Sequence, residues 1–434
     1  MKNWFKVFLI YFIFGLLVYC NSLNNKFLID DFAFKSNPVM SESKYVLSQW
    51  NPYREPQLGD YRPLAYSLYD ISYGTFKNNF RAYHLLNLFL LALVSTLIFL
   101  CIEKITGNYD LALLSGLLYL IHPINGIMVN YITANAFAFQ AICILAAVLL
   151  LLGSLERDND RTLYFFSLFF SILSLFWHES GIMTPFYISA VVLLFGKGPL
   201  KTKMIYLCPY YLISFLYILF RFYFSVGGNV LLRTALFHVT GGQYLAAMFK
   251  VYAWYISKLF YPQGIVMQWS TPIAANHIIL NILGLCSLAV IFGSLYVKFT
   301  KIKILQLALV WALIGFVPVL AAAMLRSYTC AVIEPHWFVF SSIGFFIIAA
   351  HAALSVLDRS KRIGAVLLFI LILSWGSISF AYNQLWVDQK TYALYWSQQS
   401  PYTRSTYSYL AYAYQSEGDL INSRKYYRRA LTGK

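Results

Sequence analysis

The stretch AYHLLNLFLLALVSTLIFLCI, residues 82–102, decides the fold class of this chain. It contains no Lys, Arg, Asp or Glu, and about 20 apolar residues in helical form are enough to cross the hydrocarbon core of a bilayer. Similar runs recur from one end of the chain to the other. The pattern therefore predicts an all-α, polytopic membrane protein.

The composition agrees with that prediction. Of the 434 residues, 60% are hydrophobic and only 12% are charged, whereas soluble chains carry about 25% charged residues. The composition therefore argues against a single soluble domain, a disordered chain and a coiled coil. The formal net charge is +16, but the basic residues are spread over short loops between apolar runs, as in membrane proteins that retain positive loops in the cytoplasm. We expect no nucleic-acid partner.

Eleven membrane spans are predicted. The first, about 4–23, has Lys2 and Lys6 at its start and no small-residue cleavage site after it, which indicates a retained anchor with a cytoplasmic N-terminus. The other ten are 82–102, 111–122, 134–153, 162–176, 183–195, 204–222, 276–297, 304–325, 337–356 and 363–382. Basic connectors at 197–203, 298–303 and 358–362 are expected in the cytoplasm, so the C-terminus lies outside a cytoplasmic (inner) membrane.

One further segment, residues 244–268, is long and apolar enough to span. It carries Lys250 and Lys258, and a twelfth span would place the later basic loops outside. We therefore expect a re-entrant or interfacial helix whose lysines reach the lipid headgroups.

The tail, residues 383–434, is polar, aromatic and helical in pattern. A turn at Gly418-Asp419 separates two helices, and the first has a regular apolar and aromatic spacing in Tyr407, Leu410, Ala411 and Tyr414. This spacing resembles one tetratricopeptide repeat, although Ser423 stands where a small Ala is usual. A lone repeat cannot bury its own face, so we expect it to pack on the membrane domain or on a partner.

The membrane domain, residues 1–382, places ionisable side chains at its predicted outer face, where each is costly and therefore a functional candidate. Asp30 and Asp31 lie in the first outer loop, residues 24–81. Adjacent carboxylates repel, so one of them can keep its proton at neutral pH. A helix cap or a solvated turn is the alternative interpretation.

Two more candidate groups join predicted spans at the same face. His178 and Glu179 lie between two spans, where a carboxylate among apolar groups can act as a base or orient one; an internal salt bridge is the alternative. Arg326 lies near Glu334 and His336, and its permanent charge suits a phosphate; an interfacial anchor is the alternative.

Arg62, His84 and the segment 122–135 also belong to this face, although a lone His at the end of a span is more often a packing residue. The whole set suits a substrate with a lipid tail and an anionic head. The tail would lie between helices while a base meets the head at the water boundary.

These blocks, in this order, resemble the membrane glycosyltransferases of the GT-C superfamily, and most of all the O-mannosyltransferases that carry tetratricopeptide repeats. The matching pieces are Asn21-Ser22-Leu23 through Asp30-Asp31, Tyr61-Arg62-Pro63-Leu64, His84 with Asn87, His122-Pro123-Ile124, His178-Glu179-Ser180-Gly181, and Glu334 through Ser341-Ser342-Ile343-Gly344-Phe345. They cover nearly the whole membrane part. The chain departs from the repeat-bearing relatives at His178, where a Lys is common, and at Pro335-His336, where they have an Arg-containing stretch.

The resemblance implies an enzyme that uses a polyprenyl-phosphate sugar in an inverting transfer with little or no metal dependence. It implies a catalytic base in the first outer loop, which is Asp30 or Asp31, with Asp31 favoured, and a second acidic residue at Glu179. The donor phosphate and sugar would be bound by Arg326, His336, Glu334, Arg62, His178 and His84. No metal site or cofactor is expected, although dependence on a divalent metal is an alternative that the sequence does not decide.

The expected function is therefore transfer of a sugar to a protein Ser or Thr hydroxyl. A glycan or lipid acceptor, which would make the protein a cell-envelope modifying enzyme, is a second hypothesis. A transporter or flippase of lipid-linked sugar is the third, but transporters place charges near the membrane midplane and often show repeated halves, and neither feature is visible here.

Overall fold

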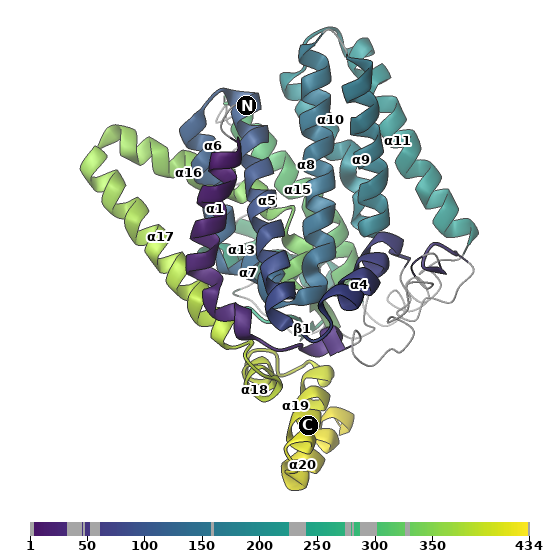
Figure 1. The fold of residues 1–434 in the computed structure, drawn as a ribbon, viewed down its shortest axis with the longest axis vertical. Helices are drawn as coiled ribbons and strands as arrows, with labels where there is room; N and C mark the ends of the chain where they lie inside the picture. Colours follow the sequence, from purple (N-terminus) through teal and green to yellow (C-terminus); the bar gives the residue numbers. More distant parts are fainter. Residues whose placement is uncertain are drawn as a thin grey trace.

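The structure, a computed structural model, describes residues 4–32, 46, 48–52, 61–157, 160–224, 240–273, 279, 282–286, 302–325 and 330–432. Helices dominate this part of the chain (Figure 1). The α-helices are α1 Trp4–Tyr19, α4 Pro63–Phe76, α5 Phe80–Thr106, α6 Tyr109–Ile121, α7 Pro123–Asn130, α8 Asn135–Glu156, α9 Arg161–Trp177, α10 Thr184–Phe195, α11 Leu200–Tyr223, α13 Gly241–Phe260, α15 Lys303–Leu325, α16 Ser342–Arg359, α17 Lys361–Gln384, α18 Gln389–Gln399, α19 Arg404–Ser416 and α20 Leu420–Thr432.

Short elements connect these helices. The two strands β1 (Trp269–Pro272) and β2 (Cys330–Ile333) pair antiparallel. Single 3₁₀ turns occur at η1 Cys20–Asn24, η2 Ile29–Phe32, η4 Ile132–Ala134, η5 Glu179–Met183 and η7 Pro335–Phe338.

The helices confirm a multi-pass membrane protein. Within the described residues, seven helices are long and apolar enough to cross a membrane, or eight if the bent pair α6 and α7 counts as one span. The predicted spans at 162–176 and 183–195 form the shorter apolar helices α9 and α10, of 17 and 12 residues, which are not among these seven. Most of the predicted span 276–297 lies outside the described residues.

The outward faces of the long helices carry apolar side chains. On α1, α11 and α17 they include Ile13, Leu17, Phe215, Phe222, Phe369 and Leu373, all of them exposed. Apolar exposure on this scale would be unfavourable in water, and it is what a surface against lipid chains requires.

The bend between α6 and α7 follows from the local sequence. Proline disfavours helical geometry in the residue before it, and His122 accordingly leaves the helix with ψ 132° just ahead of Pro123. The His122 ring then caps α7, because its Nδ1 accepts the N–H of Ile124 at 3.2 Å. The result is a bend of 60°, so this predicted site residue has a structural role.

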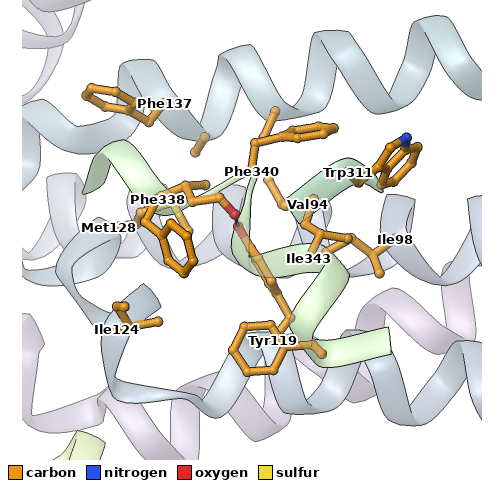
Figure 2. Packing of buried hydrophobic residues seen from close by; sticks show 14 of the residues in the cluster. Val94, Ile98, Tyr119, Ile124, Met128, Phe137, Trp311, Phe338, Phe340 and Ile343 are labelled. Carbon is orange, nitrogen blue, oxygen red and sulfur yellow. Dashed lines mark hydrogen bonds between the residues drawn. The ribbon is translucent and has the colours of Figure 1, made fainter. Parts of the chain in front are cut away.

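The buried core lies where α5, α6, α7, α8 and α15 meet the segment 338–343 (Figure 2). Tyr119 of α6 donates its hydroxyl to the carbonyl of Val339 at 3.3 Å, and Trp311 of α15 donates its indole N–H to the carbonyl of Tyr187 at 3.1 Å. The first bond fixes the chain just after η7, which carries the candidate site residue His336, and the second joins α15 to α10.

A glycine sets the distance between α15 and α16, since small residues let membrane helices approach closely. A Cβ added at Gly344 would lie 2.0 Å from the carbonyl oxygen of Ala308, and a backbone atom cannot move aside. We expect Gly344→Ala to destabilise the protein by about 1–3 kcal/mol, the usual cost of overpacking. The measurement is the thermal unfolding temperature of the purified full chain in detergent.

Gly376→Ala in α17 is the matched control, because the nearest atom to its added Cβ is Cγ2 of Val18 at 3.8 Å. It should leave the unfolding temperature unchanged. Equal unfolding temperatures for wild type and Gly344→Ala would show that α15 and α16 do not approach as described.

The segment around 244–268 is helical as predicted, but one of its lysines lies elsewhere than expected. It forms α13, which starts with a capping box in which Thr240 and Gln243 each satisfy the other's backbone N–H. Lys250 does not reach lipid headgroups: it is fully buried, and its Nζ donates to the carbonyl oxygens of Pro272 at 2.8 Å and Ile273 at 3.3 Å. The carbonyls of Pro272, the last residue of β1, and of the residue after it give this lysine partners inside the fold.

The tail forms three helices, α18 to α20, and the predicted turn at Gly418-Asp419 is confirmed. Gly418 adopts φ +84° between α19 and α20. The tail lies at the same end of the molecule as η1, η2, α4 and the β-ribbon, and at the opposite end from the N-terminus (Figure 1). The packing expected for this tail occurs there, through α18 and α19.

Candidate functional site

The acidic turn, Asp30 and Asp31, lies in η2 just beyond α1. Asp31 is fully buried, and its carboxylate accepts backbone N–H groups of Thr133 at 3.0 Å and of Leu28 and Ile132 at 3.4 Å. Asp30 is exposed, and its Oδ2 accepts the hydroxyl of Tyr131 at 2.6 Å. The two neighbours therefore differ: Asp31 accepts hydrogen bonds from the backbone inside the fold, while Asp30 is exposed.

The buried carboxyl of Asp31 has a pKa well above its usual range. Burial raises the pKa of Asp31 to about 8, despite its backbone hydrogen bonds, and the neighbouring Asp30 charge adds to the rise. In the unfolded chain the same carboxyl titrates near about 3.9. Between these values the folded protein holds a proton that the unfolded chain has lost, so this group's contribution to stability declines as the pH rises from about 4 to about 8.

Asp31→Asn should remove that part of the pH dependence, because the amide does not ionise. The measurement is the unfolding temperature of the purified protein at several pH values from about 5 to about 8. We expect a flatter profile for Asp31→Asn than for wild type or for Asp110→Asn, an exposed control in α6. Parallel profiles for all three proteins would contradict a proton bound at Asp31.

The arginine–glutamate cluster consists of Arg62, His178, Glu179 and Arg221. Arg62 binds Glu179 through two hydrogen bonds, Nε to Oε2 at 2.8 Å and Nη2 to Oε1 at 2.7 Å. Arg221 Nη1 lies 3.9 Å from Glu179 Oε2, and His178 Nε2 lies 3.6 Å from Oε1. Two guanidinium groups face one carboxylate, so the cluster carries at least one net positive charge.

Local chain geometry brings these residues together. Arg62 directly precedes Pro63, the first residue of α4, while Glu179 opens η5 where α9 has ended at Trp177. Arg221 lies in the last turn of α11. Burial alone would raise the pKa of Glu179, but the charges of Arg62, His178 and Arg221 hold it well below its usual range. Glu179 is therefore an ion-pair partner and a weak base.

The Glu334–His336 pair lies at the end of β2. Both side chains are buried, and His336 Nε2 lies 3.1 Å from Glu334 Oε2. Glu334 Oε1 accepts the amide N–H of Gln268 at 3.1 Å. Nδ1 of His336 has no hydrogen-bond partner among the described residues, and a buried polar atom of this kind calls for an explanation.

A row of aromatic rings connects the three groups. Tyr131, which binds Asp30, lies 5.7 Å from the His336 ring. The His336 ring lies 4.7 Å from Phe137, and Phe137 lies 4.4 Å from His178, all between ring centroids. The acidic turn, the Glu334–His336 pair and the arginine–glutamate cluster therefore form one continuous region at the end of the molecule that also holds the tail.

Of the predicted site residues that the structure describes, His84 does not join this region. His84 is fully buried in α5, and its two ring nitrogens lie 2.8 Å and 3.1 Å from the carbonyl oxygens of Val129 and Asn25, so it ties α5 to α7 and to the chain after η1. Arg326 lies outside the described residues.

Sequence reasoning missed Arg221, Tyr131, Phe137 and Gln268. Arg221 was hidden inside the predicted span 204–222, although a guanidinium one residue from the end of an apolar run is itself a signal. The other three carry no pattern that distinguishes them from packing residues.

Among the described residues, His, Cys, Asp and Glu side chains form no group of three or more that could hold a metal ion. Comparisons of the chain with models of protein families, with curated proteins and with solved structures found no match.

Proposed function

We propose that this chain is a GT-C-type glycosyltransferase that moves a sugar from a polyprenyl-phosphate donor to a protein Ser or Thr hydroxyl. The observation that carries the proposal is one region, called the polar region below, in which aromatic rings connect an exposed carboxylate, a net positive arginine–glutamate cluster and a buried Glu334–His336 pair. A donor with a lipid tail and a phosphate head needs a cationic contact beside a bundle with an apolar exterior. An acceptor hydroxyl needs a nearby base.

The proposal includes a topology. Eleven spans, with 276–297 as one of them, put the N-terminus in the cytoplasm and the polar region at the outer face of the cytoplasmic membrane. The positions of the N-terminus and the tail at opposite ends of the molecule support an odd number of spans (Figure 1). The helix pair α19 and α20 is the proposed tetratricopeptide-like unit.

The mechanism is a single displacement. Asp30 accepts the proton of the acceptor hydroxyl as its oxygen bonds to the anomeric carbon. The bond from that carbon to the phosphate oxygen breaks on the opposite side, and the electron pair leaves with polyprenyl phosphate. Arg62 and Arg221 stabilise the negative charge of the departing phosphate. Asp30 then releases its proton to water.

The proposed roles of Asp30 and Asp31 differ from those expected from the sequence, which favoured Asp31 as the base. The proposal assigns the base to Asp30 in place of Asp31, because Asp31 is buried and engaged with three backbone N–H groups. Glu179 orients Arg62 and Arg221, which places it beside the donor phosphate.

The test uses the purified full chain in nanodiscs with a radiolabelled polyprenyl-phosphate sugar and a Ser/Thr-rich peptide. Label on the peptide is the expected result. Label on an added glycan or lipid, with none on the peptide, would move the acceptor to the cell-envelope alternative. Movement of the donor across proteoliposome membranes without any transfer product would contradict the proposal and favour a flippase.

A further inference from the structure

The tail helix α19 contacts residues next to both acidic parts of the polar region, Ile29 beside Asp30 and Gln268 beside Glu334. The hydroxyl oxygen of Tyr409 accepts the backbone N–H of Ile29 at 2.9 Å, one residue before Asp30. The hydroxyl of Ser405 donates to Gln268 Oε1 at 3.2 Å, and the amide nitrogen of the same Gln268 donates to Glu334. Ser405 and Tyr409 are four residues apart, so they lie on one face of the helix.

The hydrogen bond from the N–H of Ile29 to Tyr409 stabilises an unfavourable backbone conformation at Ile29. Ile29 has φ 57°, a left-handed conformation that β-branched residues rarely adopt because their Cβ crowds the following carbonyl. Such outliers persist only when surrounding contacts enforce them. The conformation of Ile29 sets the direction in which the next residue, Asp30, leaves the backbone.

The tail is firmly attached where it makes these contacts. Tyr392 of α18 accepts the backbone N–H of Met267 at 2.6 Å, and the indole N–H of Trp396 donates to the carbonyl of Gln268 at 2.5 Å. Burial raises the pKa of the Tyr409 hydroxyl, and the carboxylates of Asp31 and Asp30 add to the rise. Tyr409 therefore stays neutral at physiological pH.

We propose that α19 is a wall of the site, in which Tyr409 and Ser405 are positioning residues for Asp30 and Glu334. Tyr409 holds the left-handed turn that aims Asp30, and Ser405 fixes Gln268 against Glu334. The tail is then required for catalysis itself, in addition to any acceptor that it binds. The effect on catalysis rests on the proposed function. The hydrogen bond by which Tyr409 holds the left-handed turn at Ile29, called the clamp below, does not.

The clamp is tested by hydrogen–deuterium exchange on the full chain in nanodiscs. Tyr409→Phe removes the acceptor for the Ile29 N–H and should speed exchange in a peptide covering residues 26–32 by roughly tenfold. Tyr412→Phe is the control, because Tyr412 is an exposed tyrosine on the same helix. Equal exchange in wild type and Tyr409→Phe would overturn the clamp, whether or not the protein transfers sugar.

The positioning role is tested by transfer kinetics. Tyr409→Phe and Ser405→Ala should lower kcat by roughly tenfold while the KM for the donor stays unchanged, and Ser408→Ala should match wild type. In an Ile29→Gly background Tyr409→Phe should have a smaller effect, because glycine adopts φ 57° without strain. Equal effects in both backgrounds would overturn the positioning role. Absence of transfer by wild type would instead count against the proposed function, and the exchange result would still decide the clamp.

Discussion

Asp30→Asn is expected to lower the rate of sugar transfer by about 10²–10⁴-fold, the range that general-base catalysis contributes. The amide keeps the shape of the side chain but cannot accept a proton from the acceptor hydroxyl. Asp30 is exposed and accepts the hydroxyl of Tyr131, so the replacement should leave the fold intact. The measurement is kcat for peptide labelling in nanodiscs, together with the unfolding temperature.

Asp110→Asn is the matched control, since Asp110 is an exposed carboxylate at the start of α6 and lies outside the polar region. It should retain the wild-type rate. A larger loss of transfer in Asp31→Asn than in Asp30→Asn, with the protein still folded, would return the base to Asp31. Full activity of Asp30→Asn would contradict the mechanism.

Arg221→Gln is expected to raise the KM for the polyprenyl-phosphate donor by roughly 10–100-fold, the value of a charge-assisted hydrogen bond of about 1.5–3 kcal/mol. Arg62 is engaged with Glu179 through two hydrogen bonds, whereas Arg221 Nη1 lies 3.9 Å from that carboxylate. Arg221 Nη1 also donates to the hydroxyl of Tyr217 at 3.3 Å, and we propose that this guanidinium contacts the donor phosphate. The measurement is the donor dependence of the transfer rate.

Arg81→Gln provides the control, because Arg81 is an exposed arginine whose Nε donates to Asn24 Oδ1. It should leave the donor KM unchanged. An unchanged KM in Arg221→Gln would show that the arginine–glutamate cluster does not bind the donor head. A rise in KM in both variants would indicate a general charge effect at this end of the molecule.

The helical part of the fold was predictable because lipid imposes length and apolar composition on each spanning helix. The runs at 82–102 and 363–382 correspond to α5 and α17 for this reason. The predicted span 337–356 begins earlier than the helix it corresponds to, α16, which starts at Ser342. Pro335 and its neighbours instead form a 3₁₀ turn that brings His336 into the polar region. Hydropathy does not distinguish such a buried turn from the first turn of a helix.

The β-ribbon was not predictable. Its two strands contain four residues each and are separated by more than fifty residues of chain, which is too short for an alternating pattern to be recognised. The buried Lys250 was misplaced for a related reason: its partners are carbonyl groups beside β1, and only the folded structure brings them together.

The candidate site was partly predictable. Buried or adjacent charges in a membrane protein attract attention on energetic grounds alone, and Asp30, Glu179 and His336 were found in this way. The pairing of Arg62 with Glu179 across more than a hundred residues was not, since long-range contacts leave no trace in a single sequence. The difference in burial between Asp30 and Asp31 was not predictable either, because it depends on backbone N–H groups near Thr133.

The central claim is that Asp30, the arginine–glutamate cluster and His336 surround the head of a lipid-phosphate donor at one end of the helix bundle. A cryo-electron-microscopy map of the full chain in nanodiscs with polyprenyl phosphate tests it most directly. The account predicts phosphate density within hydrogen-bonding distance of Arg221 or Arg62, on the side of the cluster that faces Asp30. Phosphate density at the opposite end of the bundle, or Asp30 far from the arginines, would contradict it.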